Sequence, residues 1–467
     1  MKKIQFLIII LLLTTDYLFT DQGEVSLKKL GKTDSPNRTV YGYHPYWVTS
    51  SCVDNYRWEL LTHIACFSVE ATSTGTFSNK HSWPSGSLWQ KIITNAHNNN
   101  VKVTLVCTLF DSAALRTLLS SSTYRNRLIQ NLLTEVQNGN ADGVNIDFEE
   151  VPGDQQTNLT TFMTDLNNTF KNARADYHVT LCGPSVDWRN AFHYENLMKN
   201  TDGIMIMCYG YYYGGSSTAG PVSLLQKGDG WSTYNVKWTI NDYLYYGKNQ
   251  NDKMILGIPY YGIDWPTNTD AAHSSTRGTG TSVTYKNAVV NANTYGRKWQ
   301  EDVKNPWYSY SSSGYHQCWY DDDESLGYKY DEVIANNLQG IGIWALGYDD
   351  GRSELWDKIE EYFSQLTGFT TSKKRLPNDT GLLKAFPNPV LDKLCFQFSA
   401  DKSGNYKLLL YDINGRLIET FVDKNISKGT YHGKINISGI RGIKKGVYYL
   451  RLQGISNDCI KLVYLGR

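Results

Sequence analysis

The chain has 467 residues, a hydrophobic fraction of 41% and a formal net charge of +1. This length accommodates one large domain and a smaller one, and the composition is that of an ordinary globular protein. The near-neutral charge excludes a dedicated nucleic-acid-binding protein, whose partner requires a basic surface. Residues 373–467 hold 17 Lys and Arg against 7 Asp and Glu, a net of +10, so the remainder carries −9. This division indicates two units with different roles.

The N-terminus has the order of charged and apolar residues that is typical of a secretory signal peptide. Met1, Lys2 and Lys3 precede an apolar run from Phe6 to Leu13, which is too short to span a bilayer. We therefore predict a signal peptide over residues 1–20 and a mature protein without a transmembrane segment, secreted or attached to the cell surface. A buried N-terminal helix is the alternative.

Eight short apolar and β-branched runs recur along residues 38–368, separated by stretches long enough for helices. Amphipathic segments such as 124–136 and 159–173 lie between them. Alternating strands and helices imply parallel pairing with helical crossovers, and eight such units predict an α/β fold of the (β/α)8 TIM barrel type. The runs are residues 40–43, 64–69, 101–109, 143–148, 179–183, 203–209, 254–260 and 340–346.

The gap between the seventh and eighth runs is much longer than a typical loop. It is rich in Tyr, Trp and Ser, so we predict an inserted α+β lobe at about residues 265–335 that forms one wall of a cleft. Residues 369–382 have the composition of an exposed linker. Alternating strands with a turn at Asn414 and Gly415 then predict an all-β sandwich over residues 383–467.

Eight cysteines in an exported protein permit disulfides, and a bridge between Cys52 and Cys66 is one candidate. Most of the cysteines lie in apolar runs, so we expect small buried side chains. The sequence has no C-x-x-C spacing that would indicate zinc. We predict no metal and no cofactor.

The segment from Asp142 to Glu149 decides the functional interpretation. Because side chains alternate along a strand, Asn145, Asp147 and Glu149 share one face and three apolar residues share the other. The polar face points into the barrel and ends at the carboxyl end, where barrel enzymes hold their active sites. A hydrogen-bonded cluster that only fills the barrel is the structural alternative. Neighbouring acids raise each other's proton affinity, as a proton donor requires.

This segment resembles the D-x-x-D-x-D-x-E signature of glycoside hydrolase family 18, the chitinase family, and it falls on the same strand as in that family. The resemblance covers about residues 38–365. Further segments similar to the family are Tyr41-Gly42-Tyr43, Phe67, Met207-Cys208-Tyr209, residues 257–262 and 342–347, and Trp319 to Asp322 with Ser325.

The resemblance implies a retaining mechanism in which the substrate's own 2-acetamido group replaces the protein nucleophile. Glu149 would protonate the leaving oxygen, Asp147 would orient the acetamido group and stabilise the charged intermediate, and Tyr209 would bond to the acetamido carbonyl. Trp344 would form an apolar floor under the sugar, although a core role is its alternative, as for Tyr209. Further predicted substrate contacts are Asn145, Tyr43, Phe67, Tyr260 and Trp265.

Three positions depart from the family pattern. Asn145 stands where an acid is usual, Val106 to Phe110 replaces the common S-x-G-G, and Gly210 stands where Asp is frequent. With one charge fewer, Asp147 should ionise more easily than in a three-acid site.

The predicted substrate is a glycan that contains N-acetylglucosamine, namely chitin or chitooligosaccharides. Asparagine at position 145 also resembles the branch of the family that acts on bacterial cell-wall or spore-cortex glycans. Alternatives are therefore peptidoglycan, the chitobiose of N-glycans, or a silent lectin on the same barrel.

The tail resembles the C-terminal sorting domain of the type IX secretion system. Phe386-Pro387-Asn388-Pro389 opens it, and Gly446 to Tyr449 followed by Lys461 to Val463 closes it. The resemblance implies the type IX secretion machinery as a partner. A carbohydrate-binding sandwich is the alternative, but the adjacent Tyr448 and Tyr449 lie on opposite faces and form no aromatic row.

Overall fold

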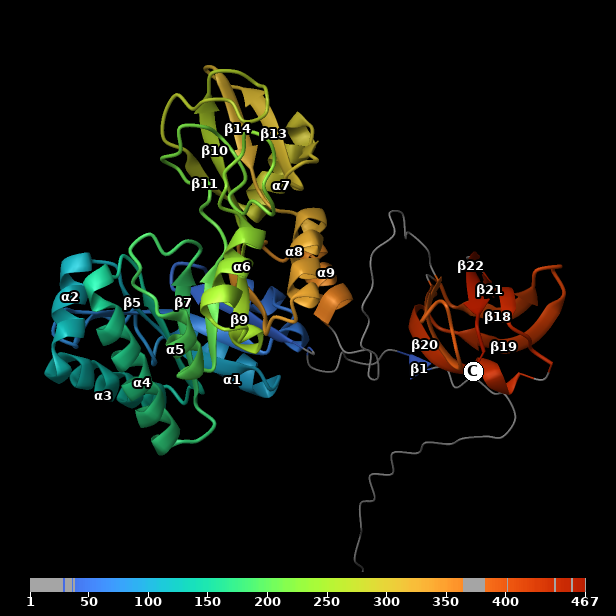
Figure 1. Cartoon of the computed structure of the whole chain (residues 1–467), viewed down its shortest axis with the longest axis horizontal. Coiled ribbons are helices and arrows are strands. Elements are labelled where there is room, and N and C mark those ends of the chain that lie inside the picture. Colours follow the sequence, from blue (N-terminus) through green and yellow to red (C-terminus); the bar gives the residue numbers. More distant parts are fainter. Residues whose placement is uncertain are drawn as a thin grey trace, which may run out of the picture. The chain divides into compact units, whose positions relative to one another are not determined.

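The computed structural model describes residues 28–29, 36, 38–363, 383–400, 402–440, 442–454 and 457–466. The predicted signal peptide and linker lie outside these residues. The described residues divide into two compact units: residues 36 and 38–363 belong to one, and residues 28–29 belong with those of 383–466 to the other (Figure 1). Among the described residues, no helix has both the length and the apolar character needed to cross a bilayer.

The larger unit is a closed barrel of eight parallel strands, which confirms the predicted fold class. The strands follow one another around the ring, and β2 closes it by pairing with both β15 and β3. The barrel strands are β2 (Thr39–Pro45), β3 (His63–Ala71), β5 (Lys102–Leu109), β6 (Gly143–Phe148), β7 (His178–Pro184), β8 (Gly203–Met207), β9 (Met254–Pro259) and β15 (Gly340–Trp344).

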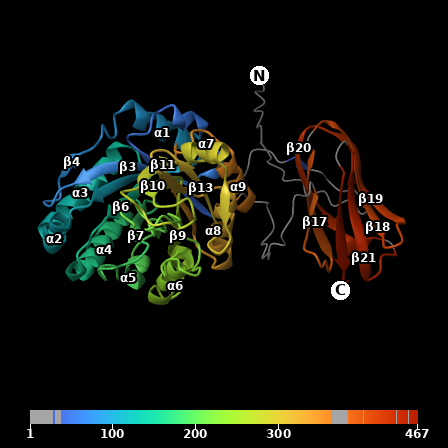
Figure 2. The ribbon, with the colours of Figure 1, turned by 90° about the horizontal axis from the view of Figure 1, so that it is seen from above.

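Helices surround this ring (Figure 2). Between β2 and β3 the chain forms two 3-10 helices, Cys52–Asn55 and Trp58–Leu60, and a short strand β4 (Phe77–Asn79) pairs with β3. The two predicted amphipathic segments are confirmed within α3 and α4. The helices are α1 (Ser87–Asn98), α2 (Ser112–Ser120), α3 (Ser122–Asn138), α4 (Gln156–Ala173), α5 (Tyr194–Lys199), α6 (Val236–Tyr246), α8 (Asp323–Ala335) and α9 (Glu354–Phe363).

Side-chain alternation along β6 separates the core from the barrel interior. Val144, Ile146 and Phe148 are buried in the layer between strands and helices, and Phe148 stacks on a ring of α4 with centroids 5.6 Å apart. Asn145 and Asp147 point the opposite way, into the barrel, as the sequence pattern predicts. The interior is otherwise filled by a small cluster of side chains, including Tyr41, Tyr43, Ala65, Phe67, Val106, Cys182, Met205 and Ile255.

The inserted lobe between β9 and α8 is a five-stranded antiparallel sheet with one helix, as expected for an α+β insertion. It occupies residues 261–319, because α8 packs on β15 and α9 and so belongs to the barrel. The sheet order is β11-β10-β14-β13-β12. Its elements are β10 (Tyr261–Thr267), β11 (Thr281–Thr284), α7 (Tyr285–Tyr295), β12 (Lys298–Gln300), β13 (Asn305–Ser311) and β14 (Tyr315–Trp319).

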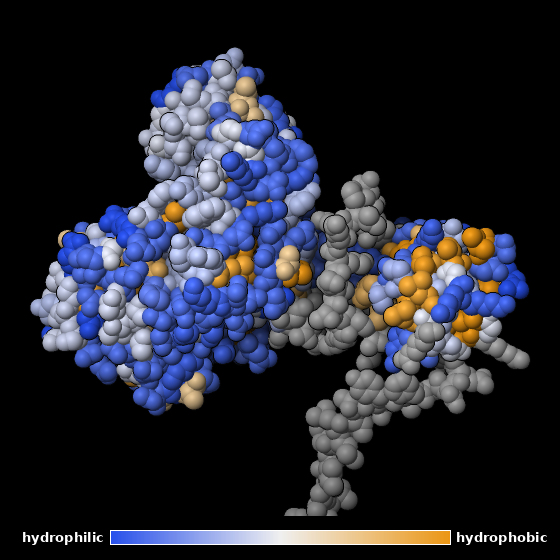
Figure 3. Space-filling model, viewed as in Figure 1, coloured by the Kyte–Doolittle hydropathy of each residue, from blue (hydrophilic) through white to orange (hydrophobic). Residues whose placement is uncertain are grey.

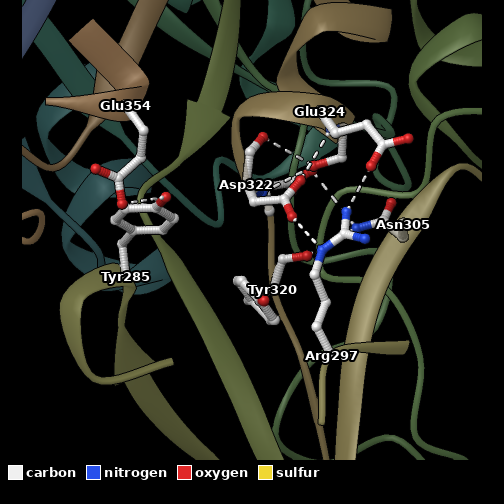
Figure 4. A network of polar contacts seen from close by, with 9 residues as sticks. Tyr285, Arg297, Asn305, Tyr320, Asp322, Glu324 and Glu354 are labelled. Carbon is white, nitrogen blue, oxygen red and sulfur yellow. Dashed lines mark hydrogen bonds and ion pairs between the residues drawn. The ribbon is translucent and has the colours of Figure 1, made fainter. Parts of the chain in front are cut away.

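Polar contacts fasten the lobe to the start of α8. Arg297 lies between Asp322 and Glu324 and donates a hydrogen bond of 2.8 Å to each carboxylate (Figure 4). Asn305 donates to the carbonyl of Tyr320 over 2.9 Å. These bonds join the lobe sheet to the first turn of a barrel helix.

A buried ion pair lies at the same junction. Asp321 and Lys329 pair with each other, and both side chains are 0% exposed. The hydroxyl of Ser325 also donates to Asp321 over 2.7 Å. Because a buried charge requires partners, this cluster fixes how the end of the lobe meets α8.

The loop 210–235 after β8 is hydrogen-bonded to the lobe. The N–H of Gly280 donates to the carbonyl of Gly214 over 2.8 Å, and the indole of Trp265 donates to the carbonyl of Tyr213 over 3.3 Å. The lobe thereby supports a loop at the carboxyl end of the barrel.

The cysteines form no disulfide. All eight lie in the described part of the chain and none of them is in a disulfide, and six of them are buried, as predicted. The candidate bridge between Cys52 and Cys66 was wrong. Cys66 is enclosed in the core on β3, whereas the thiol of Cys52 lies 3.6 Å from the hydroxyl of Thr49.

The smaller unit is an all-β structure with two four-stranded sheets and its own core, in agreement with the prediction. Apolar residues gather on the face of this unit that is visible in Figure 3. The large hydrophobic side chains of Leu391, Ile413 and Leu417 in this unit are exposed. Its strands are β1 (Lys28–Lys29), β16 (Leu383–Phe386), β17 (Lys393–Ala400), β18 (Gly404–Asp412), β19 (Leu417–Ile426), β20 (Gly429–Asn436), β21 (Gly446–Gln453) and β22 (Asp458–Tyr464).

Candidate active site

A cavity of about 980 Å³ opens at the carboxyl ends of the barrel strands. Its walls come from β2, β3, β5, β6, β7, β8 and β15 and from the loops that follow them. The inserted lobe contributes none of the residues that line it, so the expectation that the lobe forms a wall of the cleft was wrong. The lobe instead holds the loop 210–235, which carries the lining residue Tyr213.

Both predicted acids, Asp147 and Glu149, line this cavity. Asp147 lies on the inward face of β6 and is 5% exposed, and Glu149 follows two residues later and is exposed. The N–H of Glu149 still donates to the carbonyl of Leu109 over 3.3 Å, which continues the pairing of β5 and β6 beyond the strand end. One carboxyl is therefore buried in the floor and the other stands open above it.

Burial raises the pKa of Asp147, and repulsion by Glu149 raises it further. Hydrogen bonding to Cys182 acts in the opposite direction. The Oδ1 atom of Asp147 is buried and has no hydrogen-bond partner among the described residues. This oxygen is therefore available to a group that enters the cavity.

Partial desolvation by the cavity walls raises the pKa of Glu149, and the negative charge of Glu150 adds to the effect. Glu150 has a φ of 62° and pairs with Arg189 from the loop after β7. Glu149 is thus a carboxyl group that retains its proton to higher pH than an ordinary glutamate. Such a group can act as a general acid near neutrality.

Aromatic side chains surround the acids. Trp344 ends β15 and lines the cavity with its neighbours Phe67 and Tyr43, whose ring centroids lie 4.7 and 6.0 Å from its own. Tyr209 lines the cavity beyond the end of β8, and Tyr261 supports it with an edge-on ring 6.1 Å away. The structure therefore brings four predicted aromatic residues together with Asp147 and Glu149.

Three predicted substrate contacts lie outside the cavity lining. Tyr260 is fully buried in the barrel core, and Trp265 is fully buried in the lobe, where it supports Tyr213. Asn145 is also fully buried, and its amide donates to Thr180 over 2.8 Å below the floor. These three assignments as contact residues are corrected, because packed neighbours cover each side chain.

Exposed aromatic residues on the rim were missed in the sequence. Trp47, Phe110 and Trp188 line the cavity, and Trp188 is 72% exposed. Their position in the sequence could have identified them, since Trp47, Phe110 and Trp188 each lie within four residues of the end of a barrel strand. Loops at these ends usually carry binding residues.

The ionisable side chains that line the cavity, apart from its Tyr and Cys residues, are all acidic. The lining contains five carboxyl side chains and, among the described residues, no Lys, Arg or His. The described residues also contain no group of three or more His, Cys, Asp or Glu arranged to hold a metal ion. The five carboxyl residues are Glu70, Asp111, Asp147, Glu149 and Glu150.

This arrangement can perform acid–base chemistry on a bond held against an apolar floor. A carboxyl group with a raised pKa faces the cavity, a second carboxyl lies beneath it, and rings offer flat faces to a ligand. Sugar rings match such faces through their C–H surfaces. The geometry therefore agrees with a carbohydrate ligand.

Comparisons with known proteins match both units. Residues 39–349 match the family described as Glycosyl hydrolases family 18, and residues 384–464 match the Secretion system C-terminal sorting domain. Both resemblances seen in the sequence are thus confirmed.

Among curated relatives, the di-N-acetylchitobiase of Homo sapiens is 23% identical and aligns with 62% of this chain and 74% of its own length. A Bacillus subtilis protein whose name describes a sporulation-specific glycosylase is 25% identical over 52% of this chain, which spans only 56% of that relative.

Solved structures agree on the fold. A group IV chitinase of Ostrinia furnacalis in complex with allosamidin aligns with a TM-score of 0.62 at 20% identity, over 70% of this chain and 98% of the other. The spore cortex-lytic enzyme SleL of Bacillus cereus aligns with a TM-score of 0.58 at 21% identity, over 72% and 76%. Because the matched family covers most of the chain and includes both acids, the protein belongs to family 18 of the glycosyl hydrolases.

Proposed function

We propose that this protein cleaves β-1,4 bonds in glycans that contain N-acetylglucosamine, chitin or chitooligosaccharides, by a retaining and substrate-assisted mechanism. The observation that carries the proposal is the pair of acids on one face of β6, with Asp147 buried in the cavity floor and Glu149 open above it. Their roles differ because their surroundings differ.

In the first step the acetamido oxygen of the substrate attacks the anomeric carbon while the glycosidic C–O bond breaks. The carboxylic acid of Glu149 gives its proton to the leaving oxygen. Asp147 accepts a hydrogen bond from the acetamido N–H through its unpartnered Oδ1 and, once ionised, offsets the positive charge of the cyclic intermediate. In the second step the Glu149 carboxylate takes a proton from water, which attacks the same carbon and reopens the ring.

Aromatic residues support the placement of the sugar. Trp344, with Phe67 and Tyr43 beside it, provides an apolar floor, and Tyr209 carries a hydroxyl at the cavity wall. Burial keeps the pKa of Tyr209 well above its usual value, so its hydroxyl remains a hydrogen-bond donor to the acetamido carbonyl.

The relatives support a substrate built on N-acetylglucosamine. The names of the matched proteins include di-N-acetylchitobiase, chitinase, endochitinase and spore cortex-lytic enzyme. The sorting-domain match of the tail supports export through the type IX machinery to the cell surface or the medium.

The test is turnover of chitooligosaccharides, peptidoglycan and high-mannose glycoprotein by the purified protein and by Glu149→Gln. We expect turnover of the chitooligosaccharides and a loss of at least about 100-fold in kcat in the variant, because general-acid catalysis contributes about 10²- to 10⁴-fold. Activity that survives unchanged in Glu149→Gln refutes the proposal. Binding without turnover by the native protein identifies a lectin.

A further inference from the structure

A thiol lies beside the buried acid of the site. In the register of β6 and β7, Asn145 is opposite Thr180 and the next pair is Ile146 and Leu181, so Cys182 is the strand neighbour of Asp147. Cys182 is 2% exposed and forms part of the cavity floor. A cysteine is therefore the residue on β7 nearest to the acid proposed to stabilise the intermediate.

Three polar groups surround this sulfur. The thiol donates to Oδ1 of Asn145 over 3.3 Å, the hydroxyl of Tyr43 lies 3.4 Å from Sγ, and the carboxyl of Asp147 is close enough for the thiol to lower its pKa. The amide nitrogen of Asn145 donates to Thr180, which turns the amide oxygen toward the sulfur. The orientation of Asn145 is thus set by its neighbours.

The thiol has one proton, which Asn145 accepts in this structure, and the neighbouring carboxyl of Asp147 is a second group that could accept it. An ionised carboxylate is a stronger acceptor than an amide oxygen. We therefore expect the thiol to donate its hydrogen bond to Asp147 when that group is charged, and to Asn145 when Asp147 is neutral. The hydroxyl of Tyr43 can donate to the sulfur in either state. The chain Tyr43, Cys182 and Asn145 can therefore follow a change of charge on Asp147 without moving the backbone.

We propose that Cys182 is a positioning residue that holds Asp147 in its ionised form, with Oδ1 directed at the substrate, while the cyclic intermediate exists. This inference rests on the proposed function. Asn145 carries no charge and cannot repel Asp147, so the thiol supplies a hydrogen bond where a second acid would supply a shared proton.

A packing role is the alternative, because Cys182 also belongs to the apolar cluster inside the barrel and cysteine packs as a small hydrophobe. Two substitutions separate the roles. Cys182→Ser keeps a donor of similar size, whereas Cys182→Ala removes the donor at a small cost in volume. Cys318→Ala is the matched control, since Cys318 is equally buried but lies on β14 in the lobe.

For Cys182→Ala we expect kcat on chitooligosaccharides to fall about 10- to 100-fold with KM nearly unchanged, because hydrogen bonds to charged groups are worth about that factor. The acid limb of the pH profile should move to higher pH, since removal of the donor raises the pKa of Asp147. Cys182→Ser should restore most of both properties, and Cys318→Ala should match the native enzyme. Equal losses in Ala and Ser, or a native profile in Ala, overturn the proposal.

A measurement without turnover separates this inference from the proposed function. Carboxyl ¹³C shifts of Asp-labelled protein, with Asp147→Asn to assign the signal, report the titration of Asp147 directly. We expect a higher midpoint in Cys182→Ala than in the native protein and in Cys182→Ser. If the midpoint does not move, Cys182 does not influence the ionisation of Asp147 and the inference fails. The proposed function would still stand if Glu149→Gln abolishes activity.

Discussion

The buried ion pair at the junction of the lobe and α8 makes a quantitative prediction. Lys329→Met removes the cation and keeps most of the side-chain volume, but it leaves Asp321 enclosed at 0% exposure. The Oδ2 atom of Asp321 already lacks a partner among the described residues. Removing one partner of a buried pair costs about 3–5 kcal/mol, because the remaining charge stays in a medium that solvates it poorly.

The stability that Lys329→Met loses should depend on pH. Burial already raises the pKa of Asp321 against the opposing effect of Lys329, and loss of Lys329 raises it further. A group whose folded pKa lies above its unfolded value stabilises the fold at low pH and loses this contribution as pH rises. Lowering the pH from about 7 to about 5 should therefore recover up to about 2.7 kcal/mol in the variant, at about 1.36 kcal/mol per pH unit.

Urea unfolding of the full chain, followed by tryptophan fluorescence, is a suitable assay. All 13 Trp residues lie between residues 47 and 356, so the signal reports on the barrel unit alone. The double variant with Asp321→Asn should regain much of the stability at pH 7. Arg116→Met is the control, since its pair with Asp154 is more than half exposed and is worth about 0–1 kcal/mol. A loss below about 1 kcal/mol in Lys329→Met, or one independent of pH, refutes the reasoning.

Three further predictions concern the cavity. Trp188→Ala should raise KM about 3- to 10-fold for long oligomers and less for short ones, because an exposed aromatic face adds about 1 kcal/mol of sugar contact; equal effects in steady-state kinetics contradict this. Glu150→Gln should move the alkaline limb of the pH profile to lower pH. In the native protein the charge of Glu150 raises the pKa of Glu149, and activity should end when Glu149 loses its proton; an unmoved limb argues against Glu149 as the acid. Trp265→Phe should weaken binding several-fold by removing the bond to Tyr213, worth about 1 kcal/mol, and an unchanged KM would contradict it.

The sequence allowed the barrel and its acids to be predicted because both depend on local periodicity. Alternation along residues 143–149 alone separates Asp147 and Glu149 from the apolar face, and a parallel barrel exposes only one end of each strand to a site. Trp344 and Tyr209 were predicted from the family resemblance, and each lies at or just beyond a strand end.

The remaining errors concern contacts between distant segments. Tyr260 lies where the chain leaves β9 for β10, and no periodicity reveals that the ring turns into the core. Trp265 belongs to the lobe, whose docking on the loop 210–235 depends on tertiary hydrogen bonds. The pairing of Cys182 with Asp147 requires the register between β6 and β7, which neither strand carries in its own sequence.

The acidic lining of the cavity influences which glycans can enter. Glu70 and Asp111 line the cavity with Asp147 and Glu149, no cationic side chain is among the described lining residues, and only Glu150 has an arginine partner, Arg189, so the lining disfavours anions. A sugar that bears a lactyl or sialyl carboxylate therefore meets a barrier that a neutral oligomer does not, and added salt should lower that barrier by screening. Ionic strength should therefore change the selectivity: the rate on acidic oligosaccharides, divided by the rate on neutral ones, rises with salt.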